Sequence, residues 1–210
     1  MFGIINYWVF LVSGILLNLA PGPDTLYILG RSISQGRKAG VVSALGISTG
    51  AFLHTTLAAL GLSIVLAQSA LAFNTIKYAG VAYLIFLGIR TLVTKSGAIA
   101  VRETAAEEPR KIYWQGVFTN LFNPKVALFF LAFLPQFVDP ANAYGPLPFI
   151  LLGLTFITTG TIWCLIVAGS ASFATRQLRK NQKVSVILNK LTGILFIGLG
   201  LNLIRAKANG

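Results

Sequence analysis

Long apolar segments alternate with short polar ones along the chain, and this pattern predicts its architecture. Apolar runs cover residues 5–29, 41–67, 72–94, 113–138, 146–170 and 187–204. Each run is long enough for a helix that crosses the hydrocarbon core of a bilayer, which takes roughly 20 residues. The strands of a membrane barrel would instead alternate apolar and polar positions over about 10 residues. The pattern therefore predicts an all-α integral membrane protein with six transmembrane helices.

Two polar motifs interrupt the first and fourth runs, PGPD at residues 21–24 and NPK at residues 123–125. Proline has no backbone N–H and clashes with the preceding turn, so both helices should be broken at these motifs. Backbone groups opened in this way are costly in hydrocarbon, and they are tolerated only where they face protein or a water-filled cavity. We therefore expect the two breaks to face the interior of the protein.

The two interrupted segments also match each other. Residues 14–29 and 116–131 align without a gap. Three spans precede and three follow the polar cytoplasmic linker at 95–112, so related halves at 1–94 and 113–210 would face opposite directions in the membrane. The sequence therefore predicts a single transporter domain made of two inverted three-helix repeats. The identities are Gly14/Gly116, Asn18/Asn120, Leu19/Leu121, Leu26/Leu128 and Leu29/Leu131, with a weaker echo between Leu45-Gly46 and Leu152-Gly153.

Composition supports the membrane assignment and limits what the charge can mean. The chain is 55% hydrophobic and 10% charged, with a mean hydropathy of +0.77, which is more apolar surface than a soluble domain buries. Its net charge of +12 could favour nucleic acid, but the basic residues lie in short connections between the spans. Thirteen of the 17 Lys and Arg residues follow the first, third and fifth spans. Because such residues are retained in the cytoplasm, we expect both termini to be extracytoplasmic and expect no nucleic-acid partner.

Asp24 is the only acidic residue inside a predicted span. An ionisable group in that position indicates function, because its burial is expensive. We expect Asp24 to couple transport to protons by exchanging a proton as a cavity opens to either side. Two alternatives stay open: Asp24 binds a substrate ammonium directly, or it caps the free N–H groups at the start of a helix.

Lys125 is a basic residue inside the fourth predicted span, beside the break, and it aligns with Pro23 of the first repeat. We expect Lys125 to pair with Asp24 when the site is empty and to bind a substrate carboxylate when the site is full. In the alternative interpretation, its long side chain reaches the membrane interface.

Other candidates surround these two residues. Amide groups beside the breaks suit either a substrate or the opened backbone, and the residues that open the backbone join the candidate site. His54 is a second-tier candidate that could relay protons or simply hydrogen-bond a neighbouring helix, with two threonines as further polar groups. One Asp, one His and Cys164 supply neither a metal cluster nor a catalytic dyad, so we expect no metal, no cofactor and no enzyme activity. The remaining candidates are Asn18, Asn120, Asn123, Pro21, Gly22, Pro23 and Pro124, with Thr49 and Thr159 as second-tier residues.

The motifs resemble those of the LysE/RhtB family of amino-acid exporters. The APGPD segment at 20–24, the GRKAG segment at 36–40 and the LGISTG run at 45–50 are similar to the N-terminal signature of that family. The stretch at 116–140 is similar to its central signature. The resemblance implies export of amino acids across the bacterial inner membrane, driven by the proton gradient. It is nearest to the RhtB-like branch, whose substrates are mainly neutral, such as threonine, homoserine or leucine.

These observations together predict a secondary active exporter that works by alternating access, with an amino acid, protons and the lipid bilayer as its partners. Two other functions stay open: a passive channel for small polar solutes, since half-helices also build channels, and an exporter of a basic amino acid or an amino-acid derivative. The sequence does not decide the substrate, the stoichiometry of coupling or the oligomeric state, a homodimer included.

Overall fold

The computed structural model describes residues 2–20, 22–62, 107–139 and 141–180, together with single positions within 75–93 and 190–201. The third and sixth predicted spans and most of the linker lie outside the described residues, so the six-span count and the two-repeat architecture stay predictions. The described part is helical, and its only β pairing is an isolated bridge between Ile4 and Val138. The predicted all-α class is confirmed for these residues.

The first predicted break is present. Helix α1 (Tyr7–Leu19) ends at Ala20, which is extended with φ −62° and ψ 122°. Helix α2 (Pro23–Leu57) begins one residue after Gly22, whose φ of −157° and ψ of −174° are also extended. Proline suits the first turn of a helix because its missing N–H would be unpaired there in any case. Pro21 itself lies outside the described residues.

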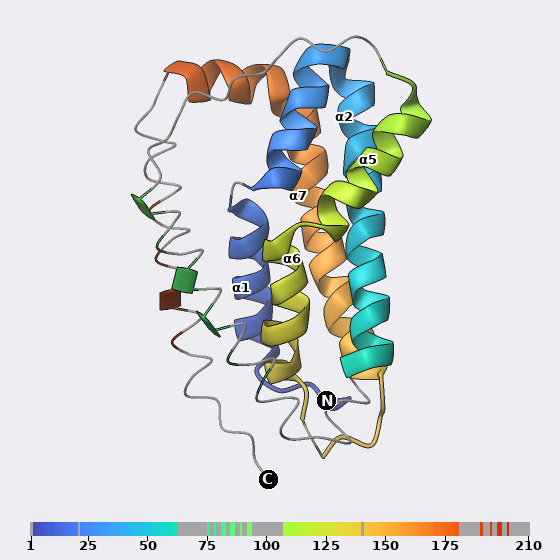
Figure 1. Cartoon of the computed structure of the whole chain (residues 1–210), viewed down its shortest axis with the longest axis vertical. Helices are drawn as coiled ribbons and strands as arrows, with labels where there is room; N and C mark the ends of the chain where they lie inside the picture. The colour runs from blue at the N-terminus through green and yellow to red at the C-terminus, as the bar shows by residue number, and fades with distance from the viewer. Residues whose placement is uncertain are drawn as a thin grey trace.

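Gly36 divides α2 into two helical segments, 23–35 and 37–57. Its φ of +85° and ψ of 174° belong to a conformation that only glycine adopts easily. Figure 1 shows that the chain reverses direction at this point, so the two segments run side by side. The second segment continues into a π-helix, η1 (Ala58–Leu62). The predicted apolar runs, which end at residue 29 and begin again at residue 41, are therefore too short. Helix continues on both sides up to the single turn residue, Gly36.

The second predicted break is also present, at Asn123. Helix α5 (Pro109–Leu121) is followed by α6 (Pro124–Leu128), the π-helix η2 (Phe129–Phe133) and the 3-10 helix η3 (Leu134–Phe137). The axis bends by 47° between Pro109–Leu121 and Pro124–Phe137. In Figure 1 this broken helix runs in the opposite direction to α1 and the first segment of α2. Opposed directions are what an inverted repeat requires of its first and fourth spans.

Helix α7 (Leu147–Lys180) packs beside α2 and completes the described bundle. By length and composition, two described stretches could cross a membrane: Pro23–Gly61, which the reversal at Gly36 divides, and Leu147–Ser170 of α7. The bent pair Pro109–Leu121 and Pro124–Phe137 counts as a third such span. Large apolar side chains such as Trp8 (74% exposed) and Phe122 (76% exposed) face outward. Exposed apolar surface of this kind suits lipid contact.

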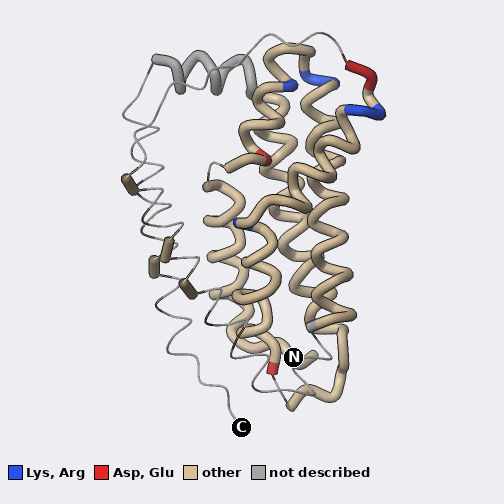
Figure 2. The backbone as a smooth tube through the Cα atoms, viewed as in Figure 1, with Lys and Arg blue, Asp and Glu red and all other residues tan. Residues whose placement is uncertain are grey.

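Charged residues of the described helices gather at one end of the bundle, as Figure 2 shows. This is the end where the chain turns at Gly36 and where α5 begins. The N-terminus lies at the opposite end. Asp24 lies in the first turn of α2 and Lys125 in the first turn of α6, so each follows one of the two breaks.

Candidate functional site

The two breaks meet inside the bundle, and Lys125 joins them. Its Nζ donates hydrogen bonds of 3.0 Å to the backbone carbonyls of Leu17 and of Ala20, at the end of α1. Pro21 has no N–H, so it cannot supply the helical partner that the Leu17 carbonyl would otherwise have. The Lys125 ammonium replaces that partner and also lies at the negative end of the α1 dipole.

This position corrects two interpretations of Lys125. The side chain is only 9% exposed, so it does not reach the membrane interface. It also forms no ion pair with Asp24: within the described residues, the ion pairs are those of Glu107 with Arg31 and with Lys111. The sequence identified Lys125 as a buried charge but did not predict its partners. Those partners are backbone carbonyls at the end of α1, which no charged residue in the sequence marks.

Asp24 forms a hydrogen bond to the other broken helix. Its Oδ2 accepts from Nδ2 of Asn120 at 2.8 Å, while its Oδ1 is buried without a partner. The N-cap of α2 is Gly22, and no side chain caps that helix end. The interpretation of Asp24 as a helix cap is therefore wrong. A buried carboxylate oxygen without a partner is uncommon in proteins and calls for a functional explanation.

His54 lies at the second break. Pro124 leaves the carbonyl of Asn120 without its helical N–H partner, and His54 Nε2 lies 3.4 Å from that oxygen. The N–H of Asn123 donates to the same oxygen at 2.9 Å. The His54 ring stacks on Phe130 with centroids 5.5 Å apart. The carbonyls that Pro21 and Pro124 leave without a helical partner are thus each approached by a nitrogen of a titratable side chain, Lys125 at the first break and His54 at the second.

A cavity lies between the breaks, α2 and α7, with about 450 Å³ of empty space that includes volume open to solvent. Its polar lining includes Asn18, Asp24, Ser48, Asn120, Lys125 and Thr161, and its apolar lining includes Ile47, Ala51, Val126, Phe156, Ile157 and Trp163. Four of the predicted site residues therefore share one cavity.

The other predicted residues hold the site together or lie beside it. Asn123 Oδ1 accepts the N–H of Lys125 at 3.1 Å and so caps α6, which Pro124 opens. Gly22 faces Lys125: a β-carbon there would lie 3.3 Å from Nζ. Pro23 is exposed in the first turn of α2.

The two second-tier threonines differ from each other. Thr159 accepts a hydrogen bond of 3.2 Å from Asn18, a residue of the cavity wall. The Thr49 hydroxyl instead pairs with the Tyr113 hydroxyl at 2.7 Å and does not line the cavity.

Asn18 and Asn120, which align in the sequences of the two broken helices, each contact a glycine of another helix. A β-carbon added at Gly50 would lie 2.7 Å from Cβ of Asn120, and one added at Gly160 would lie 3.1 Å from Oδ1 of Asn18. Each asparagine thus lies over a glycine of the second span in the other half.

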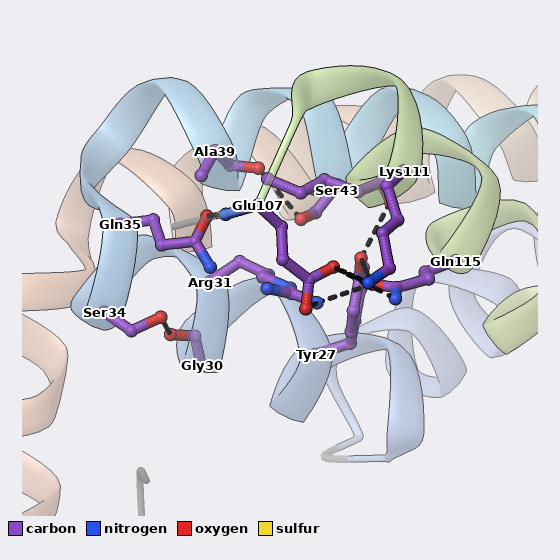
Figure 3. Close-up of polar contacts among 11 residues, drawn as sticks. Tyr27, Gly30, Arg31, Ser34, Gln35, Ala39, Ser43, Glu107, Lys111 and Gln115 are labelled. Atoms are coloured by element: carbon purple, nitrogen blue, oxygen red, sulfur yellow. Dashed lines mark hydrogen bonds and ion pairs between the residues drawn. The ribbon is translucent and has the colours of Figure 1, made fainter. Parts of the chain in front are cut away.

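The sequence did not predict a polar network that lies at the end of the bundle where charged residues gather, which we call the basic end (Figure 3). Arg31 Nη2 lies 3.2 Å from Glu107 Oε1 and also donates to Oε1 of Gln115. Gln115 Nε2 donates to Glu107 at 3.1 Å, and the backbone N–H of Glu107 donates to Gln35 at 3.0 Å. Tyr27 joins the network through its hydroxyl, which donates to the Ile112 carbonyl at 2.7 Å.

The network joins α2, α5 and the end of the linker. The sequence did contain a signal for it, because Asp24, Tyr27 and Arg31 recur at helical spacing on one face of α2. Arg31 lies two turns, about 10.5 Å, beyond Asp24. Partial desolvation raises the pKa of Glu107, but its hydrogen bond and charge contact with Arg31, with the charge of Lys111, outweigh this and lower that pKa below its ordinary value.

Comparison with known proteins identifies the family of the chain. The family model described as "LysE type translocator" matches residues 15–207. A protein named "Leucine efflux protein" from Salmonella choleraesuis (strain SC-B67) is 31% identical over 96% of each chain. The uncharacterized membrane protein YrhP of Bacillus subtilis (strain 168) is 32% identical over 89% of this chain and 92% of its own.

An uncharacterized membrane protein of Vibrio cholerae serotype O1 (strain ATCC 39315 / El Tor Inaba N16961) is 33% identical over 97% of this chain and 99% of its own. No solved structure matches the chain. The family match covers both breaks and the residues that line the cavity, and so agrees with the resemblance found in the motifs. The chain is therefore a membrane protein that belongs to the LysE type translocator family.

Proposed function

We propose that this protein exports neutral amino acids from the cytoplasm across the bacterial inner membrane in exchange for protons. The observation that carries the proposal is the buried, unpartnered Oδ1 of Asp24 in a cavity between two broken helices. Membership of the LysE type translocator family supports amino-acid export, and the relative named as a leucine efflux protein supports a neutral substrate.

Asp24 is the proposed coupling residue. An ionised carboxylate accepts hydrogen bonds from a substrate ammonium, whereas a protonated carboxyl loses that charge attraction. Substrate and proton therefore compete for the same oxygen. A proton that reaches Asp24 from outside would displace the amino acid and reset the carrier.

Alternating access requires that each end of the cavity can close. At the basic end, the network of Arg31, Glu107 and Gln115 ties α2 to α5. Toward the N-terminal end, Phe10, Phe129 and the neighbouring aromatic residues of η2 and η3 are buried in one cluster. We propose that the polar network is the cytoplasmic gate and that it breaks when the cavity opens inward.

Lys125 has a supporting role in this mechanism. Its ammonium is already held by two carbonyls of α1, so we propose that it joins the two broken helices instead of binding the substrate carboxylate. The two breaks would then move as one unit when the halves of the protein rock.

Transport in proteoliposomes tests the proposal. Wild-type protein should drive saturable, uphill flux of leucine or threonine when a pH gradient is imposed. Asp24→Asn should abolish uphill flux, while the matched control Asp139→Asn, in the loop after η3, should retain it.

Two results would overturn the proposal. Flux that is only downhill and unchanged in Asp24→Asn would indicate a passive channel. Uphill flux that persists in Asp24→Asn would remove the coupling role from this residue.

A further inference from the structure

Trp163 of α7 has an indole N–H whose position suggests a ligand. Its Nε1 is buried without a hydrogen-bond partner, although Trp163 lines the cavity. Two more cavity residues carry buried polar atoms without partners, Asp24 through Oδ1 and Asn120 through Oδ1. Buried polar atoms are nearly always paired, so three orphans around one cavity indicate a missing polar ligand.

The chemistry of the three atoms defines that ligand. A carboxylate only accepts hydrogen bonds, so the 2.8 Å contact between Asp24 and Asn120 fixes the Asn120 NH₂ group as donor and its Oδ1 as acceptor. Two acceptors on linked side chains, one of them charged, suit an ammonium group. The indole N–H of Trp163 is a donor only and requires an acceptor such as a carboxylate oxygen.

Lys125 does not compete for the carboxylate, because its Nζ already donates to the carbonyls of Leu17 and Ala20. We propose that Trp163 Nε1 donates a hydrogen bond to the carboxylate of a zwitterionic amino acid whose α-ammonium lies between Asp24 and Asn120. This inference rests on the proposed function and adds to it a residue that binds the carboxylate of the substrate.

The rest of the cavity wall defines the side chain that fits. Ile47, Val126, Phe156 and Ile157 are apolar, and Asp24 is the one carboxylate among the lining residues described. When Asp24 holds the α-ammonium, no second lining carboxylate is left for a basic side chain. The cavity therefore favours a neutral amino acid with an aliphatic side chain.

Binding of matched ligands to the purified protein tests the role of Trp163. Leucine and threonine carry a carboxylate, whereas the amino alcohols leucinol and threoninol keep the ammonium and side chain without it. Trp163→Phe should weaken binding of the amino acid about tenfold, as expected for the loss of one hydrogen bond to a charged group. The same variant should bind the amino alcohol as wild type does.

Two controls separate the hydrogen bond from packing. Replacement of Trp163 by 3-benzothienylalanine changes only the N–H to sulfur and should reproduce the loss for the amino acid. Trp114→Phe makes the same change on α5, where the ring is 49% exposed and does not line the cavity, and should bind both ligand types as wild type does.

The outcomes are distinguishable. Equal loss for amino acid and amino alcohol would assign Trp163 to packing alone, and unchanged amino-acid binding would also overturn the inference. A wild-type protein that exports no amino acid would overturn the proposed function, and this inference with it.

Discussion

Replacing Lys125 with methionine would test whether this residue joins the breaks or binds substrate. Met has a similar length but no charge and no donor, so Lys125→Met leaves the carbonyls of Leu17 and Ala20 unsatisfied. Hydrogen bonds to charged groups contribute roughly 1.5–3 kcal/mol each, so the two bonds contribute about 3–6 kcal/mol before any offset.

Part of this loss is offset, because the variant no longer buries an ammonium group. The cost of that burial is several kcal/mol, which reduces the expected net destabilisation to about 2 kcal/mol. The destabilisation should concentrate where α1 meets α6, because both acceptors belong to the end of α1.

Thermal unfolding in detergent, followed by circular dichroism, measures the effect. The matched control is Lys38→Met, since Lys38 is exposed just beyond the turn at Gly36 and should leave the melting temperature unchanged. Lys125→Met should lower the melting temperature and should weaken binding of leucine and leucinol to the same extent. A variant as stable as wild type that loses leucine binding but retains leucinol binding would refute this assignment and make Lys125 the carboxylate ligand.

Two further predictions concern the basic end of the bundle. Gly36→Ala forces a side chain into a backbone conformation with φ +85° and should cost about 1–3 kcal/mol in unfolding experiments, whereas Gly30→Ala, in a helix with open space around it, should not destabilise the protein. Because the pKa of Glu107 is lowered, its contact with Arg31 should be complete above the ordinary carboxyl pKa of 4.5 and should be lost as the pH falls below it. Melting temperatures measured across this range should fall with pH in wild type and change less in Glu107→Gln; equal slopes would contradict the predicted linkage.

The sequence alone determined the class of protein and the places where its helices break. Continuous apolar runs identify membrane helices because hydrocarbon requires every backbone group to bond within the helix. Prolines identify the breaks because the missing N–H is a local property of the residue. Asp24 became a candidate functional residue for the same reason, since a carboxylate in an apolar span is informative without any knowledge of its neighbours.

Tertiary structure decided what the polar groups contact. Lys125 bonds to carbonyls 108 and 105 positions earlier in the chain, and Asn120 bonds to Asp24, 96 positions earlier. Backbone carbonyls carry no sequence signal, so the pairing of Lys125 with Asp24 was a natural but wrong expectation. Trp163 was missed because a tryptophan in an apolar helix looks like a packing residue, and only the cavity reveals its unpaired N–H.

The network around Glu107 likewise combines residues that the sequence shows with contacts that only the tertiary structure shows. Glu107 belongs to a polar linker and Arg31 to a basic turn, and each residue alone is typical of a solvated membrane surface. Their contact depends on the reversal at Gly36 and on the crossing of α5 over α2, which fold together segments far apart in the chain. Local chemistry is encoded residue by residue, whereas the partner of a buried charge is fixed only when helices from both halves of the chain pack together.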